Sequence, residues 1–233
     1  TVTDASGNSA TTPVQTVTVD TAITAGTLSL SNFTDSGSSA TDNITNDNTF
    51  DLTISGQETG STVVYQISTD GGVTWTTTTA NQSSLTDGTY NFRATVTDAS
   101  GNSATTPVQS VTIDTTPPTA GTLSLSNFID SGSSSSDKIS NDKTFDLTIS
   151  GQEAGTTVVY QVSTDGGTSW TPTTASQSGL TDGTYNFRAT VTDSAGNSST
   201  TPVQTVVVDT QAPVAGTLSL SNFIDSGSSS SDK

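Results

Sequence analysis

The sequence predicts an all-β protein built from antiparallel β-sandwich domains, and three observations lead to this prediction. Thr, Ser, Val and Gly dominate the 233 residues, whereas strong helix formers are scarce. Apolar and polar residues alternate with a period of two, as at Phe50, Leu52 and Ile54. Polar turns that contain Gly, Asn or Asp separate short segments at intervals of roughly 8–12 residues, the spacing typical of a sandwich.

The chain also repeats itself with a period close to one small domain. Asp4 and Asp98 are 98 − 4 = 94 residues apart, and Asp98 and Asp193 are 193 − 98 = 95 apart. A unit of this length is large enough to bury its own core. Residues 216–233 also repeat residues 121–138 without a change. We therefore expect an excerpt from a longer tandem array, divided as follows: the C-terminal strand of a preceding repeat (1–20), two complete repeats (21–115 and 116–210), and the start of a following repeat (211–233).

The first complete repeat contains the expected strands in a clear order. A strand over Thr27–Ser31 is followed by a long polar loop, residues 32–48, and then by a strand with one buried face from Phe50. Val63, Tyr65 and Ile67 face one way on a third strand. Asp70-Gly71-Gly72 supplies the positive φ angles of a tight hairpin, which we expect to return through Val73–Thr76.

The second half of the repeat holds the strongest alternation. Tyr90 follows a corner and is expected to form a tyrosine corner, with its hydroxyl bonded back to the preceding turn. Phe92, Ala94 and Val96 should point inward with it. The last strand, Ser103–Asp114, changes phase after Pro107, which predicts a bulge or a change of register.

Composition excludes several functional classes. Five basic residues stand against 22 acidic ones, for a net charge of −17, which argues against nucleic acids and anionic membranes as partners. There is no Cys and no His, so disulfides, thiolate or imidazole metal sites and Ser-His-Asp catalysis are excluded. No apolar run approaches the roughly 18 residues of a membrane span. We expect the chain not to be an enzyme.

Four segments are distinctive in combination: Asp42–Asp47, Tyr65–Trp75, Asp98–Asn102 and Asp114–Pro118. Together they resemble the bacterial Ig-like repeats of giant adhesins, the type I-secreted, biofilm-associated and RTX-type surface proteins. The resemblance implies tandem Ig-like sandwiches arranged end to end at the bacterial cell surface. It implies an extender that projects a binding tip and is stiffened by calcium at and near the junctions. In the second copy Lys138 replaces Asn43, which weakens the case for Asp137 as a ligand.

Calcium prefers six to eight hard oxygens, and the recurring acidic turns supply carboxylates and amides. We hypothesise that Asp98, Asn102 and Asp114 share one pole of a repeat and bind calcium with Asp142 or its neighbours across the linker. The upstream group would be Asp4, Asn8, Asp20 and Asp47. The other candidate ligands are the loop acids Asp35, Asp42, Asp130 and Asp137 and the third copy of the turn, Asp193, Asn197 and Asp209. The alternative is that Asp-x-x-Gly-Asn is only an Asx-type turn.

The function expected from the sequence is a structural spacer of a surface adhesin, with neighbouring repeats and calcium as partners. A second possibility is a glycan-binding module that uses Trp75 and Trp170, although core or rim packing is the favoured role of both. A third is an accessory domain of a secreted hydrolase. Surface glycans would otherwise be bound by regions outside this sequence.

Overall fold

A computed structural model describes residues 1–222, 224, 226 and 228, and these residues form strands, turns and loops. This part of the chain contains no helix that is long and apolar enough to span a membrane. Two compact units are distinguished. The first comprises Thr1–Thr122, Ser150–Val159 and Ala189–Thr201, and the second comprises Leu123–Ile149, Tyr160–Arg188 and Pro202–Lys233.

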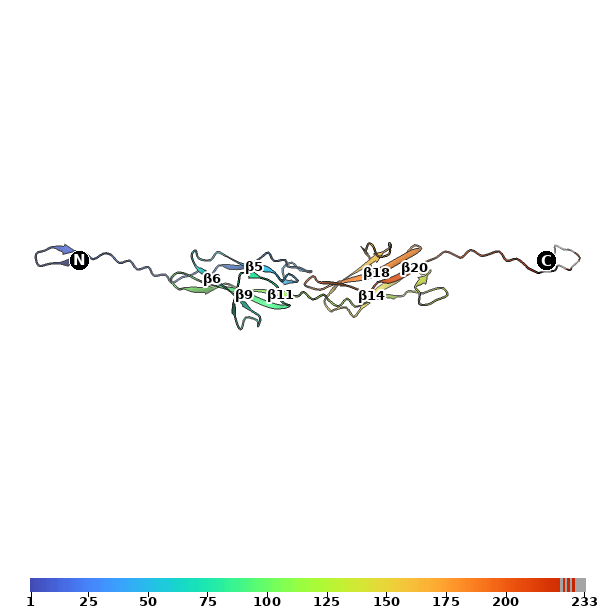
Figure 1. Cartoon of the computed structure of the whole chain (residues 1–233), viewed down its shortest axis with the longest axis horizontal. Coiled ribbons are helices and arrows are strands. Elements are labelled where there is room, and N and C mark those ends of the chain that lie inside the picture. The colour runs from blue at the N-terminus through green and yellow to red at the C-terminus, as the bar shows by residue number, and fades with distance from the viewer. Residues whose placement is uncertain (223, 225, 227, 229–233) are drawn as a thin grey trace. The chain divides into compact units, whose positions relative to one another are not determined.

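The first complete repeat forms a sandwich of two sheets (Figure 1). One sheet has the order β3-β5-β8, and the other has the order β4-β11-β9-β6-β7, with β10 paired to β9. The strands are β3 (Thr27–Ser31), β4 (Ile44–Thr45), β5 (Phe50–Ser55), β6 (Thr62–Ser68), β7 (Thr76–Thr78), β8 (Asn81–Gln82), β9 (Gly88–Thr97), β10 (Ser103–Thr105) and β11 (Gln109–Ile113).

The second repeat has the same topology, with sheets β12-β14-β17 and β13-β20-β18-β15-β16 and with β19 paired to β18. A separate two-stranded hairpin near the start consists of β1 (Val2–Thr3) and β2 (Ser9–Ala10). The strands of the second repeat are β12 (Thr122–Ser126), β13 (Ile139–Ser140), β14 (Phe145–Ser150), β15 (Thr157–Ser163), β16 (Thr171–Pro172), β17 (Ser176–Gln177), β18 (Gly183–Thr192), β19 (Ser198–Thr200) and β20 (Gln204–Val208).

The sandwich is antiparallel except at one edge of the larger sheet. There β4 pairs in parallel with the end of the last strand, so that Ile44 lies opposite Thr112. The pairing of β13 with β20 repeats this arrangement. This short crossover, which the sequence did not predict, brings the long acidic loop to the end of the last strand of its own repeat.

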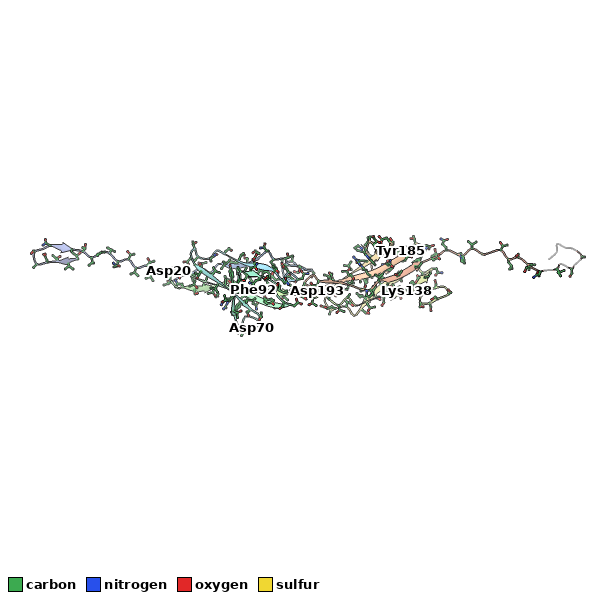
Figure 2. All side chains as sticks on the ribbon, in the orientation of Figure 1. Asp20, Asp70, Phe92, Lys138, Tyr185 and Asp193 are labelled. Carbon is green, nitrogen blue, oxygen red and sulfur yellow. The ribbon has the colours of Figure 1, made fainter. Side chains whose placement is uncertain are left out.

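An aromatic column fills the core between the two sheets. Phe33, Phe50 and Phe92 pack edge to face, with ring centroids 5.4 and 5.7 Å apart. Figure 2 shows Phe92 within the sandwich, where its side chain is fully buried. Burying one such side chain contributes roughly 1.5–3 kcal/mol to folding. Phe128, Phe145 and Phe187 repeat the column in the second sandwich.

Two local predictions are confirmed. The Tyr90 hydroxyl donates to the carbonyl oxygen of Thr86 (2.9 Å), which is the predicted tyrosine corner. The last strand shifts register by one residue, because Thr105 pairs with Thr95 whereas Gln109 pairs with Phe92. The segment between β10 and β11, which contains Pro107, therefore has one residue more than the part of β9 that lies opposite it.

The predicted starting residue of the strand that returns from this hairpin is wrong. Gly71 and Gly72 do have positive φ, but the returning strand β7 begins only at Thr76, and Val73 is exposed. The reason is Asp70, whose carboxylate accepts hydrogen bonds from the backbone amides of Val73 and Thr74. These amides are thus unavailable for strand pairing. Figure 2 shows Asp70 on the resulting loop, which projects from the sandwich.

The segments outside the two complete repeats form little regular structure. Residues 11–20 and 211–222 contain no strand, and Val14, Leu218 and Leu220 are exposed. The equivalent of Leu218 in the second repeat, Leu123, is buried because β12 lies against β14. The expected start of a following repeat, 211–233, lies partly outside the described residues.

Candidate metal site

The turn Asp98–Asn102 is held by its own side chains. Asp98 Oδ1 accepts hydrogen bonds from the amides of Ser100 (2.9 Å) and Asn102 (2.8 Å), and the Asn102 side-chain amide donates to Asp98 Oδ2 (2.7 Å). The bond from the Asn102 side chain contributes most to lowering the pKa of Asp98 from its usual value. The motif is therefore an Asx-type turn, and its acid is ionised at neutral pH.

This turn also holds the segment that leads into the sandwich. The side-chain amide of Asn102 donates a second hydrogen bond, to the carbonyl oxygen of Asp20 (3.0 Å). In the third copy of the turn, Asn197 donates to Asp193 Oδ2 (2.9 Å) and to the carbonyl oxygen of Asp114 (2.8 Å). Both of these turns thus contact the acidic residue that ends the preceding repeat.

Three carboxylates gather beside this contact. One oxygen each from Asp20, Glu58 and Asp98 lies within 4.8 Å of the other two. Glu58 follows β5, and its amide donates to the carbonyl of Thr24 (3.1 Å), which fixes the position of the acid. Each pair of like charges at this distance costs roughly 1 kcal/mol in water and more in a lower dielectric.

The donor set suits a hard divalent cation. All three ligand atoms are carboxylate oxygens, which Ca²⁺ prefers. Asp98 accepts three hydrogen bonds within its turn, and an ionised carboxylate offers about four acceptor positions. Asp98 therefore keeps capacity for an ion while the turn stays intact.

The structure keeps Asp20 and Asp98 together but does not place Asp98 and Asp114 at the same end of the repeat, as the hypothesis requires. Asp98 follows the end of β9, whereas Asp114 follows Ile113, which pairs with Gly88 at the start of β9. A strand of ten residues separates these positions by about 30 Å. Asp20 lies with Glu58 and Asp98 at one end of the sandwich.

The acidic loop lies at the other end of the repeat from the three-carboxylate cluster. Asp47 precedes β5 whereas Glu58 follows it, so Asp47 is not in the cluster with Asp20. The amide of Asp114 instead donates to the carbonyl of Thr45 in the same repeat (2.9 Å). In the second repeat the Asp209 amide donates to Ser140 O (2.9 Å), which places the loop that contains Asp142 near the end of its own β20. The parallel crossover at β4 and β13 is the physical reason.

The remaining candidates stabilise their own loops and turns. Asp47 accepts from the amide of Thr34 (2.7 Å), and Asp142 accepts from Ile129 (2.9 Å). The other contacts join backbone amides to carboxylates within one short segment: Asn43 to Asp35, Lys138 to Asp130, Ile44 to Asp42, Ile139 to Asp137, Asn8 to Asp4, Thr116 to Asp114 and Gln211 to Asp209. One buried oxygen of Asp35, and the equivalent one of Asp130, has no hydrogen-bond partner.

The second copy of the three-carboxylate cluster is arranged differently. Glu153, the counterpart of Glu58, accepts a hydrogen bond from the amide of Thr119 (3.3 Å). Within the described residues, Asp114, Glu153 and Asp193 are not brought as close together as Asp20, Glu58 and Asp98. The two glutamates therefore form a matched pair for experiments.

Two acids with a role at the junction were missed by the sequence-based hypothesis. Glu58 belongs to the cluster, and its signal was its recurrence as Glu153 at the repeat period. Asp87 binds the linker, because its carboxylate accepts from the Thr115 amide (2.8 Å) and the Thr116 hydroxyl (2.6 Å). The Thr116 bond contributes most to lowering the pKa of Asp87.

The tryptophans pack against the sheet. The guanidinium of Arg93 lies 4.1 Å from the ring centroid of Trp75, and Arg188 lies 4.2 Å from that of Trp170. The Trp75 indole nitrogen donates to the carbonyl of Gly72 (2.9 Å). An arginine therefore covers one ring face of each tryptophan, so that face is not free to stack on a sugar.

The shared topology and the recurring turn define a class of protein: tandem all-β sandwich repeats of one type. The family model of the bacterial Ig-like domain matches residues 22–115 and 117–210. The chain therefore belongs to the bacterial Ig-like domain family. No curated protein sequence matches the chain significantly.

Several solved structures are similar to this chain at low sequence identity. A Ca²⁺-stabilised adhesin that helps an Antarctic bacterium reach out and bind ice is 22% identical, with a TM-score of 0.42 over 91% of this chain. This chain spans 56% of that structure. The fibronectin(III)-like modules of Clostridium thermocellum CbhA are 13% identical, with a TM-score of 0.40 over 82% of this chain and 100% of theirs. The FN1–FN3 domains of chicken CNTN1 are 8% identical, with a TM-score of 0.36 over 81% and 66%.

Proposed function

We propose that this chain is a non-catalytic extender segment of a bacterial cell-surface adhesin, and that calcium bound by Asp20, Glu58 and Asp98 stiffens the entry to the repeat. Membership of the bacterial Ig-like domain family and near-identical tandem copies support a spacer, since a spacer needs only repetition. The observation that carries the calcium proposal is the cluster of three carboxylate oxygens within 4.8 Å. The projected tip and any role in biofilms belong to regions outside this sequence.

Calcium would act mainly by joining segments that are distant in sequence. Asp20 lies in the segment that leads into the sandwich, Glu58 in the turn after β5, and Asp98 in the turn after β9. A bound cation removes the mutual repulsion of the acids and fixes the entering segment to two turns. Extracellular modules bind calcium with Kd of roughly 10⁻⁴–10⁻³ M. At ten times Kd the stabilisation is about 1.4 kcal/mol.

Calorimetric titration of the full chain with CaCl₂ tests the proposal. The wild-type chain should bind calcium, and Glu58→Gln should weaken that site by about tenfold or more, because it removes one anionic ligand. Glu153→Gln is the matched control and should leave this site unchanged. No calcium binding by the wild-type chain at millimolar concentrations, or equal binding by Glu58→Gln, would contradict the proposal.

A further inference from the structure

Besides the three-carboxylate cluster, the first unit contains a contact that no carboxylate takes part in. It joins Ser36 and Gly37, in the long loop of the first repeat, to the turn Asp193–Asn197. The Ser36 hydroxyl donates to the carbonyl of Ala195 (2.5 Å). A Cβ on Gly37 would overlap the carbonyl oxygen of Ser194, and a Cβ on Gly196 would lie 2.9 Å from the amide nitrogen of Gly37. The two backbones approach so closely because both positions are Gly.

The contact changes the burial of the turn. Ala195 is fully buried, whereas its counterparts Ser6 and Ser100, in the two earlier copies, are exposed. A Cβ on Gly101, the counterpart of Gly196, would meet no atom within 4 Å. All three copies of the turn have similar sequences. The burial of the third turn residue therefore differs because only the turn Asp193–Asn197 lies against the surface at Ser36 and Gly37.

The second unit carries the counterpart of this receiving surface, and there it is open. A pocket is lined by Ser131, Gly132, Ile139, Ser140, Asn141 and Asp209. Each of these lies 95 positions after a residue at the same place in the first repeat: Ser36, Gly37, Ile44, Thr45, Asn46 and Asp114. A Cβ on Gly132 would meet no atom within 4 Å.

The internal hydrogen bonds of the two surfaces also match. The Ser36 hydroxyl lies 3.0 Å from Asn46 Oδ1, and the Asn46 amide donates to Ser36 Oγ (2.9 Å). The corresponding distances from Ser131 to Asn141 are 3.1 and 2.9 Å. The surface in the second unit is therefore already formed in the conformation that receives a turn in the first.

We propose that Ser131, Gly132 and Asn141 form a docking surface for the Asp-x-x-Gly-Asn turn of the repeat that follows in the chain. The Ser131 hydroxyl donates to the carbonyl of the third turn residue. The Asn of the turn donates to the carbonyl of Asp209, as Asn197 does to that of Asp114. This contact uses small residues and hydrogen bonds and does not require calcium.

The first half of the test uses the full chain without calcium. Gly37→Ala should increase hydrogen exchange of Ser194–Asn197 at least fivefold, about the factor that one hydrogen bond contributes. Gly132→Ala should leave that exchange unchanged. The two glycines have φ of 96° and 101°, so the backbone strain is matched and only the contact differs. Ser36→Ala, which keeps the backbone, should act in the same direction.

The second half uses the same chain lengthened after Lys233 by another copy of residues 139–210, because residues 211–233 already correspond to 116–138. In the lengthened chain Gly132→Ala and Ser131→Ala should now increase exchange of the added Asp-Ser-Ala-Gly-Asn turn by a similar factor. If Gly132→Ala leaves the added turn unchanged, or if the added turn exchanges as fast as Asp98–Asn102, the docking proposal is overturned. Failure of the calcium titration would leave this result untouched.

Discussion

The side-chain amide of Asn102 donates to the backbone carbonyl of Asp20 across 82 positions of sequence, at 3.0 Å. Asn8 forms the same kind of turn with Asp4 but donates only within that turn in the described structure. Asn102→Ala should lower the free energy of unfolding by about 1–2 kcal/mol, the loss of two hydrogen bonds. Asn8→Ala should cost less than about 0.5 kcal/mol. Urea denaturation in EDTA measures both, and equal effects would show that the Asp20 contact contributes nothing.

Phe92 packs edge to face against Phe50 in the aromatic column of the first sandwich, and its ring also stacks on that of Tyr90. Phe92→Ala should destabilise the first repeat by about 3–5 kcal/mol, because it leaves a cavity between the sheets. Val64→Ala, on the exposed side of β6, should cost less than about 1 kcal/mol. Thermal unfolding followed by circular dichroism would show a lower Tm for the transition of the first repeat in Phe92→Ala. An unchanged transition would mean that the column is not the core.

Asp70 makes the stability of the first repeat depend on pH in the acidic range. Hydrogen bonds from Thr74 and Ser68 lower its pKa to about 2. Because the folded pKa lies below the unfolded value, the stabilisation is present above about pH 4 and is lost as the pH falls toward 2. Asp70→Asn should therefore be less stable than wild type at pH 6, and the difference should shrink between pH 4 and 2. A difference in Tm that stays constant over this range would contradict the assignment.

Asp87 should control the mobility of the linker after the first repeat. Its carboxylate accepts hydrogen bonds from Thr115 and Thr116, immediately before Pro117 and Pro118. Asp87→Ala should increase hydrogen exchange of the Thr115 amide by about fivefold or more, since that amide loses its acceptor. Exchange in β9 should not change, because its bonds to β6 and β11 remain. Unchanged exchange at Thr115 would show that the linker is ordered by other contacts.

Much of the fold follows from sequence because alternation and turn residues act locally. Phe92, Ala94 and Val96 are predicted and observed to be buried, and Tyr90 forms the expected corner. The candidate site was harder, since it depends on which strand ends meet. The two-residue β4 has no periodic signal, yet its parallel pairing with β11 moves the acidic loop to the far end of the repeat.

Glu58 illustrates the other limit of the sequence. A single acid in a turn has no local partner that marks it as a ligand, and its neighbours in space lie 38 and 40 positions away, at Asp20 and Asp98. The recurrence of such an acid at the repeat period was the available signal. Ser36 and Gly37 likewise have no partner nearby in the sequence, and their contact with the turn Asp193–Asn197 is visible only in three dimensions.

The most direct measurement is a crystal structure of the full chain grown with calcium, with TbCl₃ soaked into parallel crystals to give a strong anomalous signal. We predict one ion between the carboxylates of Asp20, Glu58 and Asp98, with oxygen ligands at about 2.3–2.6 Å from Ca²⁺. Density with no ion at these three side chains, or with ions only at other acids, would contradict the account.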